Sequence, residues 1–188
     1  MGRWEPNARG RLEQAALELY SERGFEQTTV TEIAKRAGLT ERTFFRHFAD
    51  KREVLFGGAS SLQELMASAI VAAPESAVPI DAVGAGLDAV GVLFADRYEH
   101  SHQRQSVIIA NQELQERELI KLASMAAALA EALRRRGVAD PAASLAAEAG
   151  IAVFKVAFER WVSGPGEPDM LHHVRQSLDE FKAVAAGR

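Results

Sequence analysis

Apolar residues recur at helical spacing along almost the whole chain. Leu12, Ala16 and Leu19 are separated by four and three residues, which predicts an amphipathic helix from about residue 7 to residue 23. Gly24 then provides the left-handed backbone position that commonly follows the last turn of a helix. No segment has the alternation of apolar and polar residues that predicts a β-strand. We therefore expect an all-α fold.

Capping signals divide residues 29–48 into two short helices. Thr29 and Glu32 have the spacing of a capping box, in which each side chain accepts a hydrogen bond from the other residue's backbone N–H. Gly38 ends this first helix, and Thr40 is a suitable N-cap for a second helix over residues 41–48. Helices of this length are not stable alone, so we expect them to pack with the first helix into one unit.

A second capping box, Asp50 with Glu53, predicts a long helix that reaches about residue 73 and joins this unit to the rest of the chain. Gly57 and Gly58 lie inside that helix, where each glycine costs about 1 kcal/mol relative to alanine. Two explanations stay open: close packing against a neighbouring helix, or a hinge through which a bound ligand changes the tilt of the helix.

Residues 74–79, bounded by two prolines, form the clearest linker. Beyond them the apolar residues follow further helical stripes, one of them on a long helix over residues 142–163 that ends before the break at residues 164–166. The stripes are Ile80, Val83, Leu87, Val90 and Phe94; Leu122, Met125, Ala126, Leu129 and Leu133; Ile151, Phe154, Phe158 and Trp161; and Met170, Val174, Leu178, Phe181 and Val184.

Composition narrows the protein class. The 188 residues are 47% hydrophobic and 26% charged, an ordinary globular balance. We find no apolar run near the roughly 18 residues of a membrane span and no signal-peptide pattern, and so expect a cytoplasmic protein that does not engage a membrane. The absence of cysteine excludes disulfides, thiolate metal sites and thiol nucleophiles. The net charge is −4, but residues 1–56 are close to neutral, which leaves DNA binding open.

The spacing of residues 29–48 is that of a helix-turn-helix. A first helix braces against the DNA backbone, a glycine turn sets the angle with Leu39 pointing inward, and a second helix enters the major groove. Phe44 and Phe48 are four residues apart and are expected to face the core. The residues expected on the exposed side can all donate or accept hydrogen bonds: Glu41, Arg42, Thr43, Arg46 and His47.

These residues resemble the TetR family of bacterial transcriptional regulators. The resemblance is carried by Arg11, Leu12, Phe25, Thr29, Ile33, Ala34, Ala37, Gly38, Thr43–Phe48, Lys51 and Leu55. It implies a helix-turn-helix DNA-binding domain over residues 1–56 and a helical regulatory and dimerisation domain over residues 57–188. It also implies a ligand-responsive regulator, expected to be a repressor that a small-molecule effector releases from a near-palindromic operator. The family most often has Tyr where this chain has Phe45, and that Tyr hydroxyl reaches a DNA phosphate.

The residues expected to contact double-stranded DNA are Thr31, Thr40, Glu41, Arg42, Thr43, Phe45, Arg46, His47 and Lys51. Lys51 is expected beside a phosphate, because a positive charge at a helix N-terminus is otherwise unfavourable. Arg3, Arg9 and Arg11 fit a basic arm or a plain surface role equally well. Arg134–Arg136 fall in the last turn of a helix, where the helix dipole explains them without nucleic acid.

The regulatory domain is expected to bind a partly apolar effector among helices of residues 80–136. The residues expected to line this site are Phe94, Tyr98, Asn111, Gln112, Met125 and Trp161. Homodimerisation is expected through the last two long helices, at Ile151, Phe154, Phe158, Trp161, Leu178 and Phe181; the other explanation is that these stripes serve only the core of one chain. Small residues such as Gly150 would let helices of two chains approach closely.

No feature of the sequence favours catalysis, a cofactor or a metal. No phosphate-binding glycine loop or nucleophile elbow occurs, and the pairs His100 and His102, and His172 and His173, lack the spacing of a helical zinc site. The rival hypothesis is a helical enzyme or small-molecule carrier that shares only the helix-turn-helix domain with the TetR family. A third is a structural scaffold, which would dimerise but ignore both DNA and small molecules.

Overall fold

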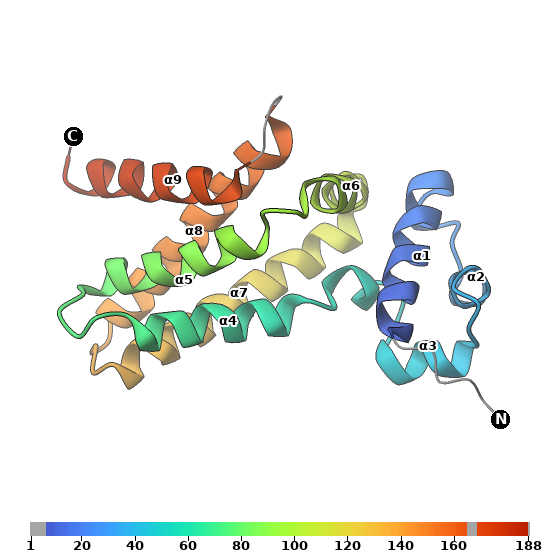
Figure 1. The fold of residues 1–188 in the computed structure, drawn as a ribbon, viewed down its shortest axis with the longest axis horizontal. Helices are drawn as coiled ribbons and strands as arrows, with labels where there is room; N and C mark the ends of the chain where they lie inside the picture. Colours follow the sequence, from blue (N-terminus) through green and yellow to red (C-terminus); the bar gives the residue numbers. More distant parts are fainter. Residues whose placement is uncertain (1–6, 165–168, 188) are drawn as a thin grey trace. The chain divides into compact units, whose positions relative to one another are not determined.

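The computed structural model describes residues 7–164 and 169–187, and within these ranges the chain forms helices, turns and loops but no strand (Figure 1). The all-α prediction is confirmed. The helices are α1 (Ala8–Arg23), α2 (Val30–Arg36), α3 (Glu41–His47), the 3₁₀ helix η1 (Glu53–Phe56), α4 (Ala59–Ala72), α5 (Pro79–Leu93), α6 (Tyr98–Ile109), α7 (Gln112–Arg135), α8 (Ala142–Ser163) and α9 (Met170–Ala185).

The chain divides into two compact units. Unit 1 contains the described residues up to Gly58 together with Gln103–Glu118, which are the end of α6 and the beginning of α7. Unit 2 contains Ala59–His102 and the described residues from Leu119 onward. The sequence predicts a single domain boundary after residue 56. The structure differs because residues 103–118 also belong to unit 1.

The core of unit 1 is built by the apolar faces that the sequence predicts, with one addition. Leu12, Phe44 and Phe48 are buried, as the helical spacing indicates. The addition comes from the segment 103–118, whose buried apolar residues pack into the same cluster: Val107, Ile108 and Leu114. This burial explains why the segment belongs to unit 1.

The predicted long helix from Asp50 to residue 73 is wrong. Asp50 does accept hydrogen bonds from the backbone N–H groups of Arg52 and Glu53, at 2.8 and 3.1 Å, but it caps a turn that leads into η1. Residues 57 and 58 then form a turn, and α4 begins only at Ala59. Two consecutive glycines are poor helix formers, so the helix breaks where the sequence analysis placed a continuous one.

One stretch, Glu53–Ala72, has the length and the mean hydropathy, 1.3, of a membrane span. This corrects the expectation that no apolar run comes near that length. Length and composition alone are weak evidence for a membrane span, because the core helix of a globular protein has them as well. In the structure the stretch is divided between η1, a turn and α4, and Met66 and Ile70 pack into the core of unit 2.

Unit 2 is a helical bundle in which α5 packs against α4, α8 and α9, and α8 packs against α9 (Figure 1). The predicted helix over residues 142–163 is confirmed as α8, although the break at 164–166 falls partly outside the described residues. Two glycines set the close approach of helices within the chain. A Cβ at Gly150 would lie 2.3 Å from a methyl carbon of Val83, and one at Gly91 would lie 2.7 Å from the Cα of Leu171. Gly150 therefore serves packing inside one chain.

Candidate nucleic-acid interface

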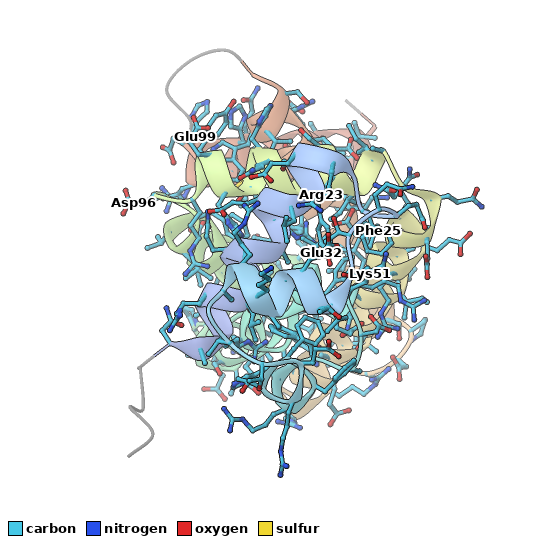
Figure 2. All side chains as sticks on the ribbon, turned by 90° about the vertical axis from the view of Figure 1, so that its right-hand side faces the viewer. Arg23, Phe25, Glu32, Lys51, Asp96 and Glu99 are labelled. Atoms are coloured by element: carbon cyan, nitrogen blue, oxygen red, sulfur yellow. The ribbon has the colours of Figure 1, made fainter. Side chains whose placement is uncertain are left out.

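The helix α2 begins with the predicted capping box. The backbone N–H of Glu32 donates to Oγ1 of Thr29 at 3.3 Å, and the backbone N–H of Thr29 donates to Oε2 of Glu32 at 2.9 Å. The hydrogen bonds from Thr29 hold the pKa of the Glu32 carboxylate below its usual range. Arg23 of α1 pairs with the same carboxylate at 2.5 Å, which fastens α1 to the start of α2 (Figure 2).

A tight turn sets the direction of α3. Gly38 has a φ of +67°, a left-handed conformation that glycine adopts without strain. The backbone N–H of Leu39 donates to the carbonyl of Ala34 at 2.8 Å, and Leu39 packs against the core. Thr40 then caps α3, because its Oγ1 accepts from the backbone N–H of Thr43 at 3.2 Å. The arrangement is the helix-turn-helix that the sequence predicts.

The helix α3 has one buried and one exposed side. Phe44 is fully buried, and its ring lies 5.6 Å from that of Phe48. The opposite side carries Glu41, Arg42, Phe45 and Arg46, which share one exposed face through their spacing of three and four residues. Phe45 is 55% exposed, an unusual position for a large apolar side chain.

Arg42 and Arg46 differ from the other arginines of unit 1. Within the described part of the chain, their guanidinium groups make no ion pair or hydrogen bond, although both are exposed. The other described arginines of unit 1 are each engaged with a carboxylate or a backbone carbonyl: Arg9, Arg11, Arg23, Arg36, Arg52, Arg104 and Arg117. Two uncommitted guanidinium groups on one helix face suit the recognition of guanine edges or phosphates.

The remaining candidates on α2 and α3 are partly occupied. Thr31 donates its hydroxyl to Glu41 at 2.6 Å, which links α2 to α3, and the hydroxyl oxygens of Thr40 and Thr43 lie 3.1 Å apart. His47 is half-buried, and its Nε2 is shielded from solvent without a partner among the described residues. The hydrogen bonds of Thr31 and Thr40 hold α3 in position.

Lys51 has a structural role that the sequence did not reveal. Its ammonium group donates to the backbone carbonyls of Phe25, Glu26 and Thr28, at 2.9, 3.3 and 3.1 Å. It also lies 4.3 Å from the ring centroid of Phe25 (Figure 2). The reason given for a phosphate contact, a charge at the start of a long helix, does not hold because that helix is absent. The hydroxyl of Tyr20 donates to the carbonyl of Lys51 at 2.6 Å, and burial raises the pKa of that hydroxyl.

The expected basic arm is only partly visible. Arg9 pairs with Glu13 and donates to the carbonyl of Gly57, and Arg11 donates to the carbonyl of Ala37. Both therefore brace unit 1, which favours the surface role over an arm on DNA. Arg3 lies outside the described residues.

The segment 103–118 is attached by charged side chains to η1 and to the turn before it. Arg52 pairs with Glu113 at 2.5 Å, and Arg117 pairs with Glu53. Arg104 donates to the carbonyl of Leu55 at 2.8 Å and pairs with Glu118 at 3.1 Å. Burial lowers the pKa of Arg104, and the neighbouring Glu118 opposes this shift. The apolar run at residues 107–109, set among polar residues, is the sequence signal that could have placed this segment in the core.

The predicted effector residues fall into two groups. Phe94, Tyr98, Met125 and Trp161 belong to unit 2, and all but Met125 join one aromatic cluster. Asn111 and Gln112 belong to unit 1, where their amide groups donate to the Val107 carbonyl and to Glu116. The structure therefore does not bring the six residues into one site within a unit.

Unit 2 also has an open groove of about 690 Å³, for which the sequence pattern gives no signal. It lies between α4 and α7, and none of the predicted effector residues lines it. Its lining combines small apolar residues with charged ones, among them Ala67, Val71, Ala128, Glu131 and Arg135.

Most of the predicted dimer residues lie in the core of unit 2. Ile151, Phe154, Trp161 and Leu178 are buried there, and their exposed fractions are between 1% and 8%. Phe158 and Phe181 are half-buried and pack against the same core. Their packing favours the alternative that these stripes build the core of one chain, and the dimer interface remains a proposal.

A different apolar face is exposed on α8. Leu145 is 67% exposed and Val156 is 42% exposed, and Ala149 and Ala152 lie between them at helical spacing. Val184 is exposed on α9.

The remaining polar clusters have local explanations. Arg136 donates to the carbonyls at the end of α4, including that of Ala73 at 2.6 Å, and Arg134 pairs with Asp140 at 2.8 Å. His172 and His173 have ring centroids 5.8 Å apart. Among the described residues, no group of three or more His, Asp or Glu side chains is arranged to hold a metal ion.

Comparison with known proteins decides the family. Residues 13–56 match the family model of bacterial regulatory proteins of the tetR family. Residues 77–186, more than half of the chain, match the model of the MftR C-terminal domain. The chain belongs to the TetR family. The helix-turn-helix of residues 29–48 lies inside the segment that matches the tetR family model.

Two relatives extend the comparison. The HTH-type transcriptional regulator TcmR of Streptomyces glaucescens is 39% identical over 82 residues, which cover 44% of this chain and 36% of TcmR. The match thus spans about a third of that relative. MftR of Mycobacterium tuberculosis, named as a regulator of mycofactocin biosynthesis, is 28% identical over 141 residues, covering 72% of this chain and 69% of MftR.

A solved structure supports the fold as a whole. SmeT, the repressor of the Stenotrophomonas maltophilia multidrug efflux pump SmeDEF, was solved in complex with triclosan. It matches with a TM-score of 0.67 over 94% of this chain and 90% of SmeT, at 19% sequence identity. At this identity the likeness concerns the fold of the TetR family, including the helical body.

Proposed function

We propose that this TetR-family chain is a cytoplasmic, ligand-responsive transcriptional repressor that binds a near-palindromic DNA site as a homodimer. The observation that carries the proposal is the pair of exposed, uncommitted arginines, Arg42 and Arg46, on the outer face of α3. The other described arginines of unit 1 form ion pairs or hydrogen bonds within that unit. A helix that keeps two guanidinium groups free on one face is suited to the major groove of DNA.

Thr31, Thr40, Glu41, Thr43, Phe45 and His47 remain proposed members of the DNA-contacting surface. Thr31 and Glu41 are bonded to each other, so at least one of them changes partner if either contacts a base. Lys51 has its ammonium on three carbonyls, so we propose positioning as its first role.

Dimerisation is proposed through the exposed face of α8, formed by Leu145, Ala149, Ala152 and Val156. An exposed apolar stripe on a long helix favours self-association, because pairing two copies removes both stripes from water. A two-fold dimer presents two copies of α3, which is why the proposed operator is near-palindromic.

Ligand response is proposed from the family and from the division of the chain. A fold relative, SmeT, binds triclosan, which supports a small-molecule site in a body of this kind. Helices α6 and α7 each belong to unit 2 over part of their length and to unit 1 over residues 103–118. A ligand that changes either helix in unit 2 therefore acts on an element that is bonded through Arg104 to η1, the 3₁₀ helix that follows α3.

The test is a selection of bound sequences from a randomised 30-base-pair DNA library, followed by gel shifts at stated salt concentrations. We expect a near-palindromic consensus bound by a protein dimer, and we expect members of a library of small aromatic compounds to release it. Uniform binding to all sequences, or none at all, would refute the repressor assignment and favour the rival hypotheses of a carrier, an enzyme or a scaffold.

A further inference from the structure

Aromatic side chains from three helical segments of unit 2 surround Trp161. Phe94 at the end of α5 and Tyr98 at the start of α6 each have a ring centroid 5.6 Å from that of Trp161. Phe158, one turn before Trp161 on α8, lies 5.7 Å from it. Trp161 is 1% exposed, whereas the three surrounding rings are only half-buried. The cluster thus has a fully buried indole at its base and partly accessible rings around it.

The indole of Trp161 carries a hydrogen-bond donor without an acceptor. Its Nε1 is shielded from solvent and has no partner among the described residues. The nearby Tyr98 hydroxyl donates its proton to the carbonyl of Gly164, at 3.3 Å. The rings lie edge-to-face with the indole, and a contact between an N–H and an aromatic face is much weaker than a bond to oxygen.

An unpaired buried N–H calls for an explanation, because nearly all buried donors in native proteins are paired. Phenylalanine at position 161 would supply a ring for the cluster without a polar group. The tryptophan therefore places a donor where the protein's own described groups do not use it. A ligand that brings an acceptor would remove the cost of the unpaired donor on binding.

We propose that this cluster binds the effector, and that the effector is a neutral, planar aromatic molecule with a carbonyl-type acceptor that accepts from Nε1–H of Trp161. The proposal rests on the ligand response proposed above and names the chemistry of its ligand. Phe94, Tyr98 and Phe158 provide ring faces and edges for an aromatic skeleton. None of the four side chains carries a charge, and an unpaired charge would be costly to bury there, which favours a neutral ligand.

The site also lies where a ligand can act. Phe94 caps the end of α5 and Tyr98 is the first residue of α6, whereas Trp161 and Phe158 belong to α8. A ring that enters between them must displace Phe94 or Tyr98, and so shifts the start of α6. The same helix contributes its other end to unit 1.

The test compares 9-fluorenone with fluorene, which have the same ring system and differ in the carbonyl. The chain of 188 residues carries Trp4→Phe and ¹⁵N-labelled tryptophan, so that Trp161 provides the single indole signal. We expect fluorenone to bind at least roughly tenfold more tightly than fluorene, because only fluorenone pairs the buried N–H. The indole N–H proton signal should move downfield with fluorenone and not with fluorene.

Trp161→Phe provides the matched variant, and its melting curve shows whether it folds. It should bind the two compounds within about twofold of each other, because the donor is gone. The comparison of the two compounds on the Trp4→Phe chain stands even if Trp161→Phe fails to fold.

Equal affinities, an unmoved indole signal, or no binding of either compound would overturn the inference. DNA release is measured separately by a gel shift on the selected operator. If fluorenone binds at Trp161 and the operator stays bound, the ligand site stands and the ligand response fails. If other compounds release the operator while fluorenone and fluorene bind equally, the response stands and this ligand chemistry falls.

Discussion

The ammonium group of Lys51 lies 4.3 Å from the ring centroid of Phe25 and donates to the backbone carbonyl of the same residue at 2.9 Å. Two further carbonyls, of Glu26 and Thr28, complete its hydrogen bonds. An ammonium group has three N–H donors, so the loop between α1 and α2 uses all of them. Lys51 thereby fixes the loop between α1 and α2 to the segment that follows α3.

Lys51→Ala should therefore lower the stability of unit 1. The expected loss is about 1.5–3 kcal/mol in the free energy of unfolding, because several hydrogen bonds from a charged group disappear. Urea denaturation measures it, and Lys35→Ala, at an exposed position of α2, is the control and should change little. The salt dependence of DNA binding should keep its slope. A slope flatter by about one unit, with unchanged stability, would instead assign Lys51 to a phosphate.

The two adjacent glycines should respond differently to alanine. A Cβ at Gly57 would lie 2.6 Å from Oε1 of Glu13 and 3.1 Å from the buried ring of Phe48, whereas a Cβ at Gly58 meets nothing within 4 Å. Gly57→Ala should cost about 1 kcal/mol, because the Phe48 ring has little room to move. Gly58→Ala should be neutral or stabilise by up to about 1 kcal/mol.

The same pair of variants tests the hinge hypothesis. Packing alone predicts that Gly58→Ala leaves the effect of a ligand on operator affinity unchanged. A Gly58→Ala protein that folds and binds DNA but no longer responds to ligand would show that flexibility at this turn is required, and packing would then be an insufficient explanation.

Dimerisation should depend on the exposed face of α8. Leu145→Glu combined with Val156→Glu places four charges in a symmetric interface and should yield a monomer at micromolar concentration, measured by light scattering after size exclusion. Val92→Glu is the matched control, because Val92 is similarly exposed, at 65%, on a different helix. A dimer that survives the α8 double variant would move the interface elsewhere.

Local features of the fold were predictable because their causes are local. The capping box at Thr29 and the positive φ of Gly38 follow from the chemistry of a few neighbouring residues, and α8 has the predicted bounds. The break at Gly57 is not predictable in this way, because a capping signal at Asp50 starts a turn whether or not a long helix follows.

Non-local features were not predictable from the pattern. Ile108 is buried in unit 1, although the segments on both sides of residues 103–118 belong to unit 2. The spacing of apolar residues does not show which of two cores a segment joins. The stripe through Trp161 predicted an apolar face, but one face fits a core and a dimer interface equally well. Only the burial of Trp161 in a single chain separates the two, and the same burial reveals its unpaired N–H.

Phe45→Tyr should strengthen DNA binding. Phe45 is exposed on the reading face, so an added hydroxyl has room and can donate to a phosphate oxygen. A hydrogen bond to a charged group predicts roughly tenfold higher affinity for the operator. The salt dependence should stay the same, because no ion is released. An affinity equal to that of the parent protein would show that this ring does not stand beside the DNA backbone.

The central claim is that the outer face of α3 reads DNA through Arg42 and Arg46. The most direct test is fluorescence anisotropy of the selected operator at one stated salt concentration, with Arg42→Ala, Arg46→Ala and the control Arg36→Ala. Arg36 is an arginine of the same unit that is committed to Glu22, at 2.8 Å. Each α3 variant should lose about 1–3 kcal/mol of binding free energy, and the control should stay within about twofold of the parent protein. Parent-like affinity in both α3 variants would contradict the account.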